Sequence, residues 1–385
     1  MPPLGGRPHA ARPVLVRALG ERAGRAIPLL LTGPPGAGKT ALLLEAAEML
    51  AAQGSTPVYL DLMGAASSPE RFVRAALAAL PANVFGGRLP QATAIERLAE
   101  QGKKGGAAAV EALFALWSSL DEAGGRPVVL LLDEVTEVRS LAYFAGLREV
   151  DRMLAAALAR RRRGTLAATS YGTQARRLWP AWETLEVPPL AGAELAAVAR
   201  EIQADAEALA RVCFGWPRYL QALWDRLARG ERIEDAWTAE MVAGGRLEQC
   251  AHQTYETLLL RSRGYGMSKA VLGAVADEEG LNLTSLVARV GRTPGAVRDY
   301  LGWLLGVDAL RSARKRYFYV DGMVRCWVRL HARGTPPSAE EIAALAREVM
   351  AVPPAAVPPA ADVAPAAEPE VAAVVPRVDT LMEID

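Results

Sequence analysis

Short apolar runs alternate with longer stretches of helical periodicity over the first half of the chain. The runs predict strands at residues 27–31, 57–62, 128–132, 165–170 and 183–190. Between them, residues 41–50, 71–80, 107–123 and 144–163 have the pattern of helices, whereas the polar, glycine-rich residues 85–106 are expected to form a surface loop. Strands that alternate with helices in this way indicate an α/β fold with a doubly wound, five-stranded parallel sheet.

The pattern changes at residue 191, after which the strand signals stop. Three or four helices are predicted up to about residue 263. Residues 266–330 then predict helices at 268–278, 283–290 and 294–305, followed by a hairpin at 309–320, which is the order of a winged helix-turn-helix. One more helix is expected to start at Ser338, because Ser338 and Glu341 have the spacing of a capping box.

These changes divide the chain into five predicted regions. Residues 1–190 form the core, 191–263 a helical region, 264–331 the winged helix and 332–350 a short helix. Residues 351–385 are expected to be a disordered, acidic tail rich in alanine and proline. Its last eight residues alternate apolar and acidic side chains, which leaves open a docking peptide for a protein partner or a frayed terminus.

Composition limits the class of protein. The chain has 385 residues, of which 51 % are hydrophobic and 23 % charged, as expected for a globular protein of two or three domains. Its three cysteines are scattered without metal-ligand or disulfide spacing, which favours a reducing cytoplasm. No apolar run approaches the roughly 18 residues that span a bilayer, and no signal peptide is recognised. We therefore expect a cytoplasmic protein without a membrane partner.

Charge is distributed unevenly around the total of +1. Residues from His331 onward include three basic and nine acidic side chains, so the rest of the chain carries about +7. A basic body suggests an anionic partner. The four consecutive arginines at 160–163 are expected to be a solvated helix end, and Lys103 and Lys104 are expected to lie in a solvated loop.

The most informative chemical motif is a phosphate-binding loop. Its eight residues fit the pattern G-x-x-x-x-G-K-[ST] and are Gly33, Pro34, Pro35, Gly36, Ala37, Gly38, Lys39 and Thr40. The glycines let successive N–H groups converge on phosphate oxygens at a helix N-terminus. Lys39 supplies positive charge at the β- and γ-phosphates, and the Thr40 hydroxyl is a ligand for Mg²⁺. The motif predicts that the cofactors are ATP and Mg²⁺.

A second motif lies at the end of the strand over residues 128–132. Asp133 and Glu134 follow directly, at the edge of an open α/β sheet where ligands bind. This is the Walker B pattern, in which Asp133 would hold Mg²⁺ directly or through water. Glu134 is the candidate general base for the attacking water. Two solvated acids that cap the next helix are the alternative.

The order of these motifs resembles the AAA+ ATPases over about residues 25–330. Within them it is most similar to the branch of archaeal/bacterial ATPases, origin-recognition initiators and STAND signalling NTPases. The resemblance implies a helical lid after the five-stranded core, with sensor 1 at Ser170, where many members have Asn. It also places the sensor 2 arginine at Arg218, beside the lid residue Pro217, and the arginine finger at Arg176 or Arg177. A guanidinium that reaches the γ-phosphate from the lid would make lid closure depend on the nucleotide.

The predicted winged helix carries candidate DNA-binding residues. Arg298 is near the N-terminus of the recognition helix, the end that contacts bases in such modules. The others lie in the preceding turn or the basic hairpin: Arg292, Arg311, Arg314, Lys315 and Arg316. Each phosphate they neutralise would steepen the salt dependence of binding by about 0.9 in a log–log plot. A winged helix used only for packing or for protein contact is the alternative.

These features together predict an ATP-hydrolysing AAA+ switch that binds duplex DNA through its winged helix. One alternative is a STAND-like signalling or scaffold NTPase whose winged helix contacts protein. Another is an accessory ATPase of transposition or plasmid replication. An arginine finger acting on a neighbouring subunit would require a homo-oligomer, which the sequence leaves open.

Overall fold

The computed structural model describes residues 12–81, 84, 88–123, 125–262 and 264–351. Its larger sheet is built from β1 (Leu29–Thr32), β2 (Thr56–Asp61), β3 (Glu122–Ala123), β4 (Arg126–Asp133), β5 (Thr165–Thr169) and β6 (Glu183–Glu186). Five strands are parallel and lie in the order β2-β4-β5-β1-β6, which confirms the predicted parallel sheet. The short β3 was not predicted and pairs antiparallel with β4, and β6 is shorter than predicted.

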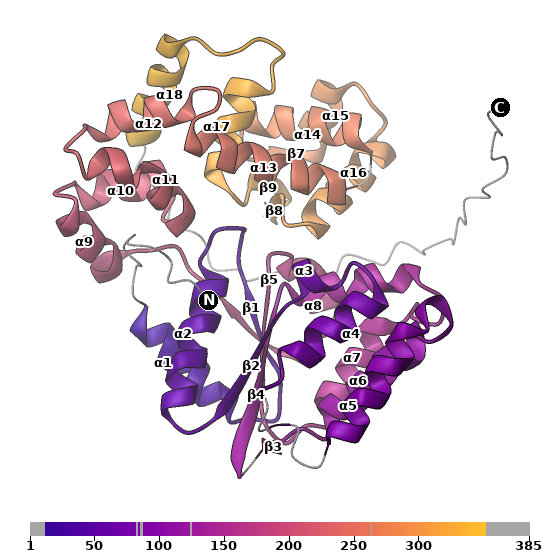
Figure 1. Ribbon diagram of the computed structural model, residues 1–385. Helices are drawn as coiled ribbons and strands as arrows, with labels where there is room; N and C mark the ends of the chain where they lie inside the picture. The colour runs from indigo at the N-terminus through magenta and orange to yellow at the C-terminus, as the bar shows by residue number, and fades with distance from the viewer. Residues whose placement is uncertain (1–11, 82–83, 85–87, 124, 263, 352–385) are drawn as a thin grey trace, which may run out of the picture. The chain divides into compact units, whose positions relative to one another are not determined.

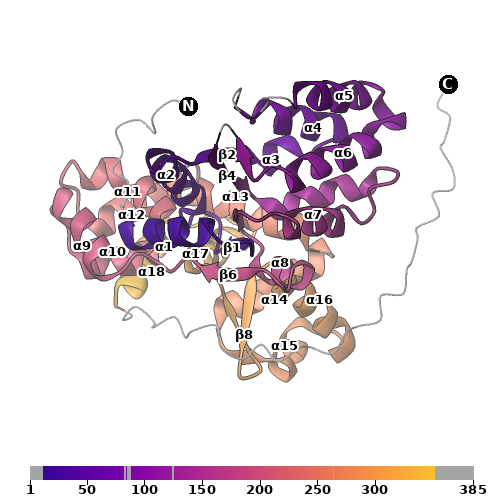
Figure 2. The same cartoon turned by 90° about the horizontal axis from the view of Figure 1, so that it is seen from below.

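Alternating side chains of the strands divide the core into two layers. Leu29 and Leu31 of β1 face the layer that contains α1 (Pro13–Ala23) and α2 (Lys39–Ala52). Leu30 faces the opposite layer, which contains α4 (Pro69–Ala78), α5 (Leu89–Glu100), α6 (Gly106–Ser118) and α7 (Val150–Ala159). Figures 1 and 2 show these two sets of helices on the two sides of the sheet. Because both faces are covered, the central strands β1, β4 and β5 are buried along most of their length.

Two of the predicted elements in this region were wrong. Residues 85–106 are not only loop, because α5 and the 3₁₀ turn η2 (Gly102–Lys104) lie within them. Within the helix predicted at 144–163, only α7 is helical, because residues 144–149 form an interruption between it and the 3₁₀ helix η3 (Val135–Tyr143), which was not predicted. Gly146 lies in the interruption with φ +82°, and a Cβ there would approach the Ala107 side chain to 2.9 Å. A regular helix therefore does not fit at this position.

The arginine run at 160–163 was also misinterpreted at one position. Arg161 is only 2 % exposed, and its guanidinium donates hydrogen bonds to the carbonyl oxygens of Trp117, Leu120 and Val128. It therefore joins the end of α6 to the start of β4. Arg160 and Arg162 are exposed, as expected for a solvated helix end.

Five helices, rather than three or four, follow the parallel sheet. They are α9 (Gly192–Glu201), α10 (Ala206–Cys213), α11 (Pro217–Leu227), α12 (Ile233–Met241) and α13 (Arg246–Arg261). Their buried residues, such as Leu209, Tyr219 and Trp237, belong to the same apolar core as α1 and α2.

The next part of the chain contains the predicted three helices and hairpin. The elements are α14 (Tyr265–Asp277), β7 (Leu281–Asn282), α15 (Leu283–Val290), α16 (Pro294–Gly306), β8 (Leu310–Ala313), β9 (Arg316–Tyr319) and α17 (Gly322–His331). The strands form an antiparallel sheet in the order β7-β9-β8. Asn282, Thr293 and Asp321 start their helices by accepting hydrogen bonds from backbone N–H groups of the first turn.

The last helix is α18 (Ala339–Ala351), and the capping box predicted before it is present. The Ser338 N–H donates to Glu341 Oε2 at 2.7 Å, and the Glu341 N–H donates to Ser338 Oγ at 3.2 Å. The predicted acidic linker and terminal peptide lie outside the described residues, apart from Ala351. Among the helices described, none combines the length and the apolar composition needed to cross a membrane.

Candidate active site

The phosphate-binding loop joins β1 to α2. Gly36 and Gly38 have φ values of +86° and +92°, a conformation that favours glycine. Gly36 is also in close contact with α11, because a Cβ on it would lie 2.5 Å from the Cβ of Arg218. Gly38 is the N-cap of α2 and provides no side-chain cap for the first-turn N–H groups. These donors at a helix N-terminus fit the phosphates of a nucleotide.

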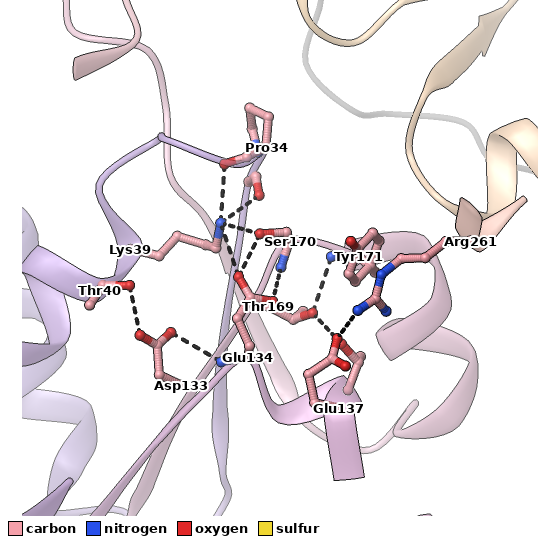
Figure 3. Close-up of polar contacts among 12 residues, drawn as sticks. Pro34, Lys39, Thr40, Asp133, Glu134, Glu137, Thr169, Ser170, Tyr171 and Arg261 are labelled. Atoms are coloured by element: carbon pink, nitrogen blue, oxygen red, sulfur yellow. Dashed lines mark hydrogen bonds and ion pairs between the residues drawn. The ribbon is translucent and has the colours of Figure 1, made fainter. Parts of the chain in front are cut away.

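Lys39 is the first residue of α2 and is only 4 % exposed. Its ammonium group donates to the carbonyl oxygens of Gly33 and Pro34 at 2.9 and 3.1 Å, and to Ser170 Oγ at 2.9 Å. Burial lowers the pKa of Lys39, and the nearby Glu134 and Asp133 carboxylates oppose this effect. The ammonium is thus placed between the loop and the ends of the strands, as Figure 3 shows.

The two residues proposed to hold the metal are in direct contact. Thr40 Oγ1 donates to Asp133 Oδ2 at 2.6 Å, across the gap between α2 and β4. A hydroxyl and a carboxylate are oxygen ligands of the kind that Mg²⁺ takes, and Mg²⁺ usually keeps waters and substrate phosphates as its remaining ligands. The residues present therefore fit Mg²⁺ bound together with a nucleotide. The described residues contain no cluster of three or more metal-binding side chains, so an all-protein metal cage is not indicated there.

Glu134 and Ser170 lie together, as expected if β4 and β5 are parallel neighbours. Ser170 Oγ donates to Glu134 Oε1 at 2.6 Å, and the Ser170 N–H donates to Glu134 Oε2 at 2.9 Å. Glu134 has φ +46° and ψ +51°, a left-handed conformation that is strained for glutamate. Glu134 Oε1 is also 3.9 Å from Lys39 Nζ. The candidate base Glu134, Ser170 and Lys39 are thus one connected group (Figure 3).

The proposed sensor 2 residue reaches the loop with its backbone but not with its guanidinium. The Arg218 N–H donates to the Gly36 carbonyl at 3.3 Å, and Pro217 lies 3.7 Å from the position of a Cβ on Gly38. The Arg218 guanidinium instead donates to Thr254 Oγ1 and Gln253 Oε1 of α13, at 3.0 and 2.9 Å. In this structure Arg218 therefore connects the loop to α13.

Arg176 and Arg177 are not brought into this group. Both lie on α8 (Gly172–Leu178) and are exposed. Arg176 makes one long hydrogen bond, 3.5 Å from its Nη2 to Thr173 Oγ1. Neither arginine contacts Lys39, Asp133 or Glu134 through any interaction of the described residues.

Several polar residues at the edge of the sheet were missed by sequence reasoning. Glu137 accepts from Arg261 of α13 at 2.5 Å, and the Arg261 guanidinium lies over the Tyr171 ring, 4.4 Å from its centroid. Burial raises the pKa of Glu137, although Arg261 opposes the shift. The acid follows Glu134 by three residues, but no sequence pattern pairs it with an arginine 124 positions away.

A second contact between distant parts of the chain lies close by. Asp308, in the turn before β8, accepts from the Thr173 N–H at 3.0 Å and from the Thr173 hydroxyl. Thr173 is three residues after Ser170, so the segment that contacts Glu134 is also held by residues from the C-terminal half. Nothing in the local sequence of Asp308 indicates this contact.

The six predicted DNA-binding residues lie around α16 and the β8–β9 hairpin. Arg292, Arg298, Arg314, Lys315 and Arg316 are exposed, and Arg311 is half-buried with its guanidinium over the Phe318 ring. Arg316 also donates to the Gly280 carbonyl at 2.7 Å. In the described part of the chain, none of the six forms an ion pair, so their charges are available to an anion.

The sequence of residues 14–170 matches the family described as the AAA ATPase domain. No curated protein matches the chain. The matched residues include the phosphate-binding loop, both Walker B acids and Ser170. Together with the parallel sheet, this match assigns an AAA+ P-loop ATPase domain to the N-terminal part of the chain.

A solved structure of another protein, with a TM-score above 0.5, shows the same fold. A Walker-type ATPase of Pyrococcus abyssi aligns with a TM-score of 0.61 at 15 % identity, over 83 % of this chain and 96 % of that one. The RuvB Holliday junction branch migration motor of Thermotoga maritima aligns with a TM-score of 0.35 at 19 % identity, over 80 % and 88 % of the two chains. Cdc6p of Pyrobaculum aerophilum aligns with a TM-score of 0.38 at 12 % identity, over 91 % and 96 %.

Proposed function

Because residues 14–170 form an AAA ATPase domain, we propose that the protein is an ATP-hydrolysing switch that binds duplex DNA through residues 264–331. In this proposal, residues 1–190 are the nucleotide-binding core, 191–263 the helical lid and 264–331 a winged helix. The observation that carries it is the convergence of Lys39, Asp133, Glu134 and Ser170 at one edge of the sheet. Few other reactions need a lysine, a metal-binding carboxylate and a second carboxylate beside a phosphate loop.

The proposed reaction is in-line attack of water on the γ-phosphate of ATP. A bond forms between the water oxygen and the γ-phosphorus, the bridging bond to the β-phosphate breaks, and ADP and phosphate leave. Glu134 takes the proton of the water, while the Lys39 ammonium and the first-turn N–H groups of α2 stabilise negative charge on the phosphates. Mg²⁺, held through Thr40 and Asp133, adds further positive charge when it is bound.

Ser170 has a defined part in this proposal. Its hydroxyl and N–H occupy both oxygens of Glu134, and the hydroxyl also accepts from Lys39. Arrival of the γ-phosphate gives Lys39 a stronger acceptor, because hydrogen bonds between charged groups are stronger than those to neutral ones. The nucleotide state then changes the contacts of Ser170, and through the adjacent Tyr171 those of Arg261.

The proposal that the protein binds DNA rests on the charge and the position of basic side chains. Six cations surround α16 and the hairpin, five of them are exposed, and none is neutralised by an ion pair in the described residues. Arg176 and Arg177 are exposed on α8, which suits a finger that acts on a neighbouring subunit. We therefore include a homo-oligomer in the proposal.

The ATPase is tested with Lys39→Ala. This variant should lose ATP binding, because the ammonium that faces the phosphates is removed. Arg160→Ala, an exposed substitution outside the site, is the matched control and should bind ATP normally. Unchanged ATP affinity in Lys39→Ala would remove the phosphate-binding role of the loop.

DNA binding is tested by titration of a duplex at two salt concentrations. The wild-type protein should bind and lose affinity as salt rises, and Arg314→Glu with Arg316→Glu should bind weakly at both. The variant Arg160→Glu with Arg162→Glu changes the same number of charges elsewhere and should leave binding nearly intact. Equal weakening by both variants would show that only net charge matters.

The contacts of Asp308 with Thr173, and of Arg261 with Glu137, favour a second candidate, a STAND-like signalling NTPase. Such a protein uses its C-terminal half to hold the ATPase in one state and to contact another protein. Absence of duplex binding at low salt, with ATP binding intact, would support this candidate over the first.

A further inference from the structure

Asp133 accepts three hydrogen bonds, one of them from a residue that the sequence did not single out. Thr40 Oγ1 donates to Oδ2 at 2.6 Å, and the Glu134 N–H donates to Oδ1 at 3.0 Å. The third donor is the hydroxyl of Tyr59, which lies 3.0 Å from Oδ2. Tyr59 belongs to β2, the edge strand that pairs with β4 so that Asp61 lies opposite Asp133.

The acceptor capacity of the carboxylate decides how it can hold a cation. Each carboxylate oxygen offers two lone-pair positions. Thr40 and Tyr59 together fill both positions on Oδ2, whereas Glu134 fills one of the two on Oδ1. One position on Oδ1 remains for a metal ion or for a water bound to it.

We propose that Tyr59 is a positioning residue that restricts Asp133 to a single contact with the divalent cation and so favours Mg²⁺ over Ca²⁺. This inference rests on the proposed ATPase function. Mg²⁺ requires near-octahedral geometry and keeps several waters, so one contact from the carboxylate suits it. Ca²⁺ takes six to eight oxygens and often binds a carboxylate through both of them, which Tyr59 prevents.

The environment of Tyr59 suits a permanent donor. The residue is half-buried and packs against the same core as α2. A phenol, with an ordinary pKa of about 10, keeps its proton at neutral pH, so the Tyr59 hydroxyl can donate to Asp133 there. Phenylalanine keeps the ring and its packing but lacks the hydroxyl, and it is therefore the informative substitution.

The test is nucleotide affinity of Tyr59→Phe in Mg²⁺, in Ca²⁺ and in a chelator, measured by displacement of a fluorescent ATP analogue. With the chelator, the affinity should equal that of wild type. The ratio of the nucleotide affinity in Mg²⁺ to the affinity in chelator should be about 10-fold smaller in the variant than in wild type. This is the usual effect of losing a residue that orients a metal ligand. The corresponding ratio for Ca²⁺ should be equal to or larger than that of wild type. Without the Tyr59 hydroxyl, Asp133 Oδ2 has a lone pair free to bind Ca²⁺.

The matched control is Tyr265→Phe. It also removes a hydroxyl bound to a carboxylate, that of Glu256 at 2.9 Å, but it has no contact with Asp133. All three of its affinities should equal the wild-type values. Thermal unfolding without nucleotide checks that both variants are folded.

Two outcomes overturn the inference while the proposed function stands. One is an unchanged preference for Mg²⁺ over Ca²⁺ in Tyr59→Phe. The other is an equal loss of affinity in the chelator and in Mg²⁺, which would mean that Tyr59 supports the loop and not the metal ligand. Failure of the wild-type protein to bind nucleotide under any condition overturns the proposed function itself, and the inference with it.

Discussion

The tip of the β8–β9 hairpin combines backbone strain with positive charge, and replacing it should have two opposite effects. Ala313 pairs with Arg316, so Arg314 and Lys315 alone form the turn. Their φ values are +50° and +62°, as in a two-residue turn that normally contains Asn-Gly. Two long cationic side chains in this conformation contradict the local preference, which suggests that they are there for function.

The expected size of each effect follows from the geometry. A left-handed conformation costs about 1–2 kcal/mol for a residue with a Cβ. Arg314→Asn with Lys315→Gly relieves most of this strain, although glycine loses about 0.5–1 kcal/mol more chain entropy on folding. We expect a net gain in stability of about 1 kcal/mol. If both cations contact phosphates, the steepness of the plot of log affinity against log salt should decrease by about 1.8 in the variant. The loss of DNA affinity between 50 and 200 mM salt should then be about tenfold smaller than in wild type.

Thermal unfolding and duplex titration at several salt concentrations measure the two effects on the same preparation. The control variant Arg314→Lys with Lys315→Arg keeps both charges and the strained turn, so it should match wild type in both assays. If the Asn-Gly variant is more stable than wild type, its weaker DNA binding cannot be explained by damage to the fold. An unchanged salt slope in the Asn-Gly variant would contradict the phosphate contacts, and a lower stability would contradict the backbone strain.

Two further predictions concern buried polar groups. Arg161→Met leaves three carbonyl oxygens without their donor, so the free energy of unfolding should fall by about 3 kcal/mol or more in denaturant titration, while Arg160→Met should have almost no effect. Burial raises the pKa of Asp308 above its ordinary value, and Arg176 and the bonds from Thr173 only partly oppose it. A raised folded-state pKa favours the folded protein at low pH, and this contribution is lost as pH rises from about 4 upward. The stability of Asp308→Asn relative to wild type should therefore increase as the pH rises above about 4. A difference in unfolding temperature that does not change with pH would argue against ionisation of Asp308 as the cause.

The parts of the site that could be predicted from the sequence are those formed by residues close together in the chain. The loop from Gly33 to Thr40 and the acids after β4 each depend on a few adjacent residues with a fixed chemical task. Their meeting at one edge follows from parallel strand order alone. The pairing of Glu134 with Ser170 could be anticipated for the same reason, because both residues follow neighbouring strands.

The contacts that sequence reasoning missed join residues far apart in the chain. Tyr59 and Asp133, Glu137 and Arg261, and Thr173 and Asp308 are separated by 74, 124 and 135 positions. No hydrophobic period or motif spacing encodes such a pair. Arg161 was misread for a related reason: a run of four arginines indicates solvent, whereas three carbonyl oxygens in the fold provide enough acceptors to bury one of them.

The errors in secondary structure have local causes. The polar and glycine content of residues 85–106 suggested a loop, but Pro90 lies at the start of α5, where its missing N–H does no harm to a helix. The buried face of α5 consists of Ala92, Ile95 and Ala99, and two small alanines give a weak hydrophobic period. In the interval before α7, Gly146 interrupts the helix at a position that the surrounding alanines and leucines obscure.

Glu134→Gln tests whether Glu134 is the base for ATP hydrolysis. The amide can keep both contacts with Ser170 by accepting from its N–H and donating to its hydroxyl, so the fold should be preserved. In single-turnover assays with Mg²⁺ and saturating ATP, the hydrolysis rate should fall about 10²–10⁴-fold, while ATP affinity stays close to the wild-type value. Hydrolysis by Glu134→Gln at the wild-type rate would show that Glu134 is not the base.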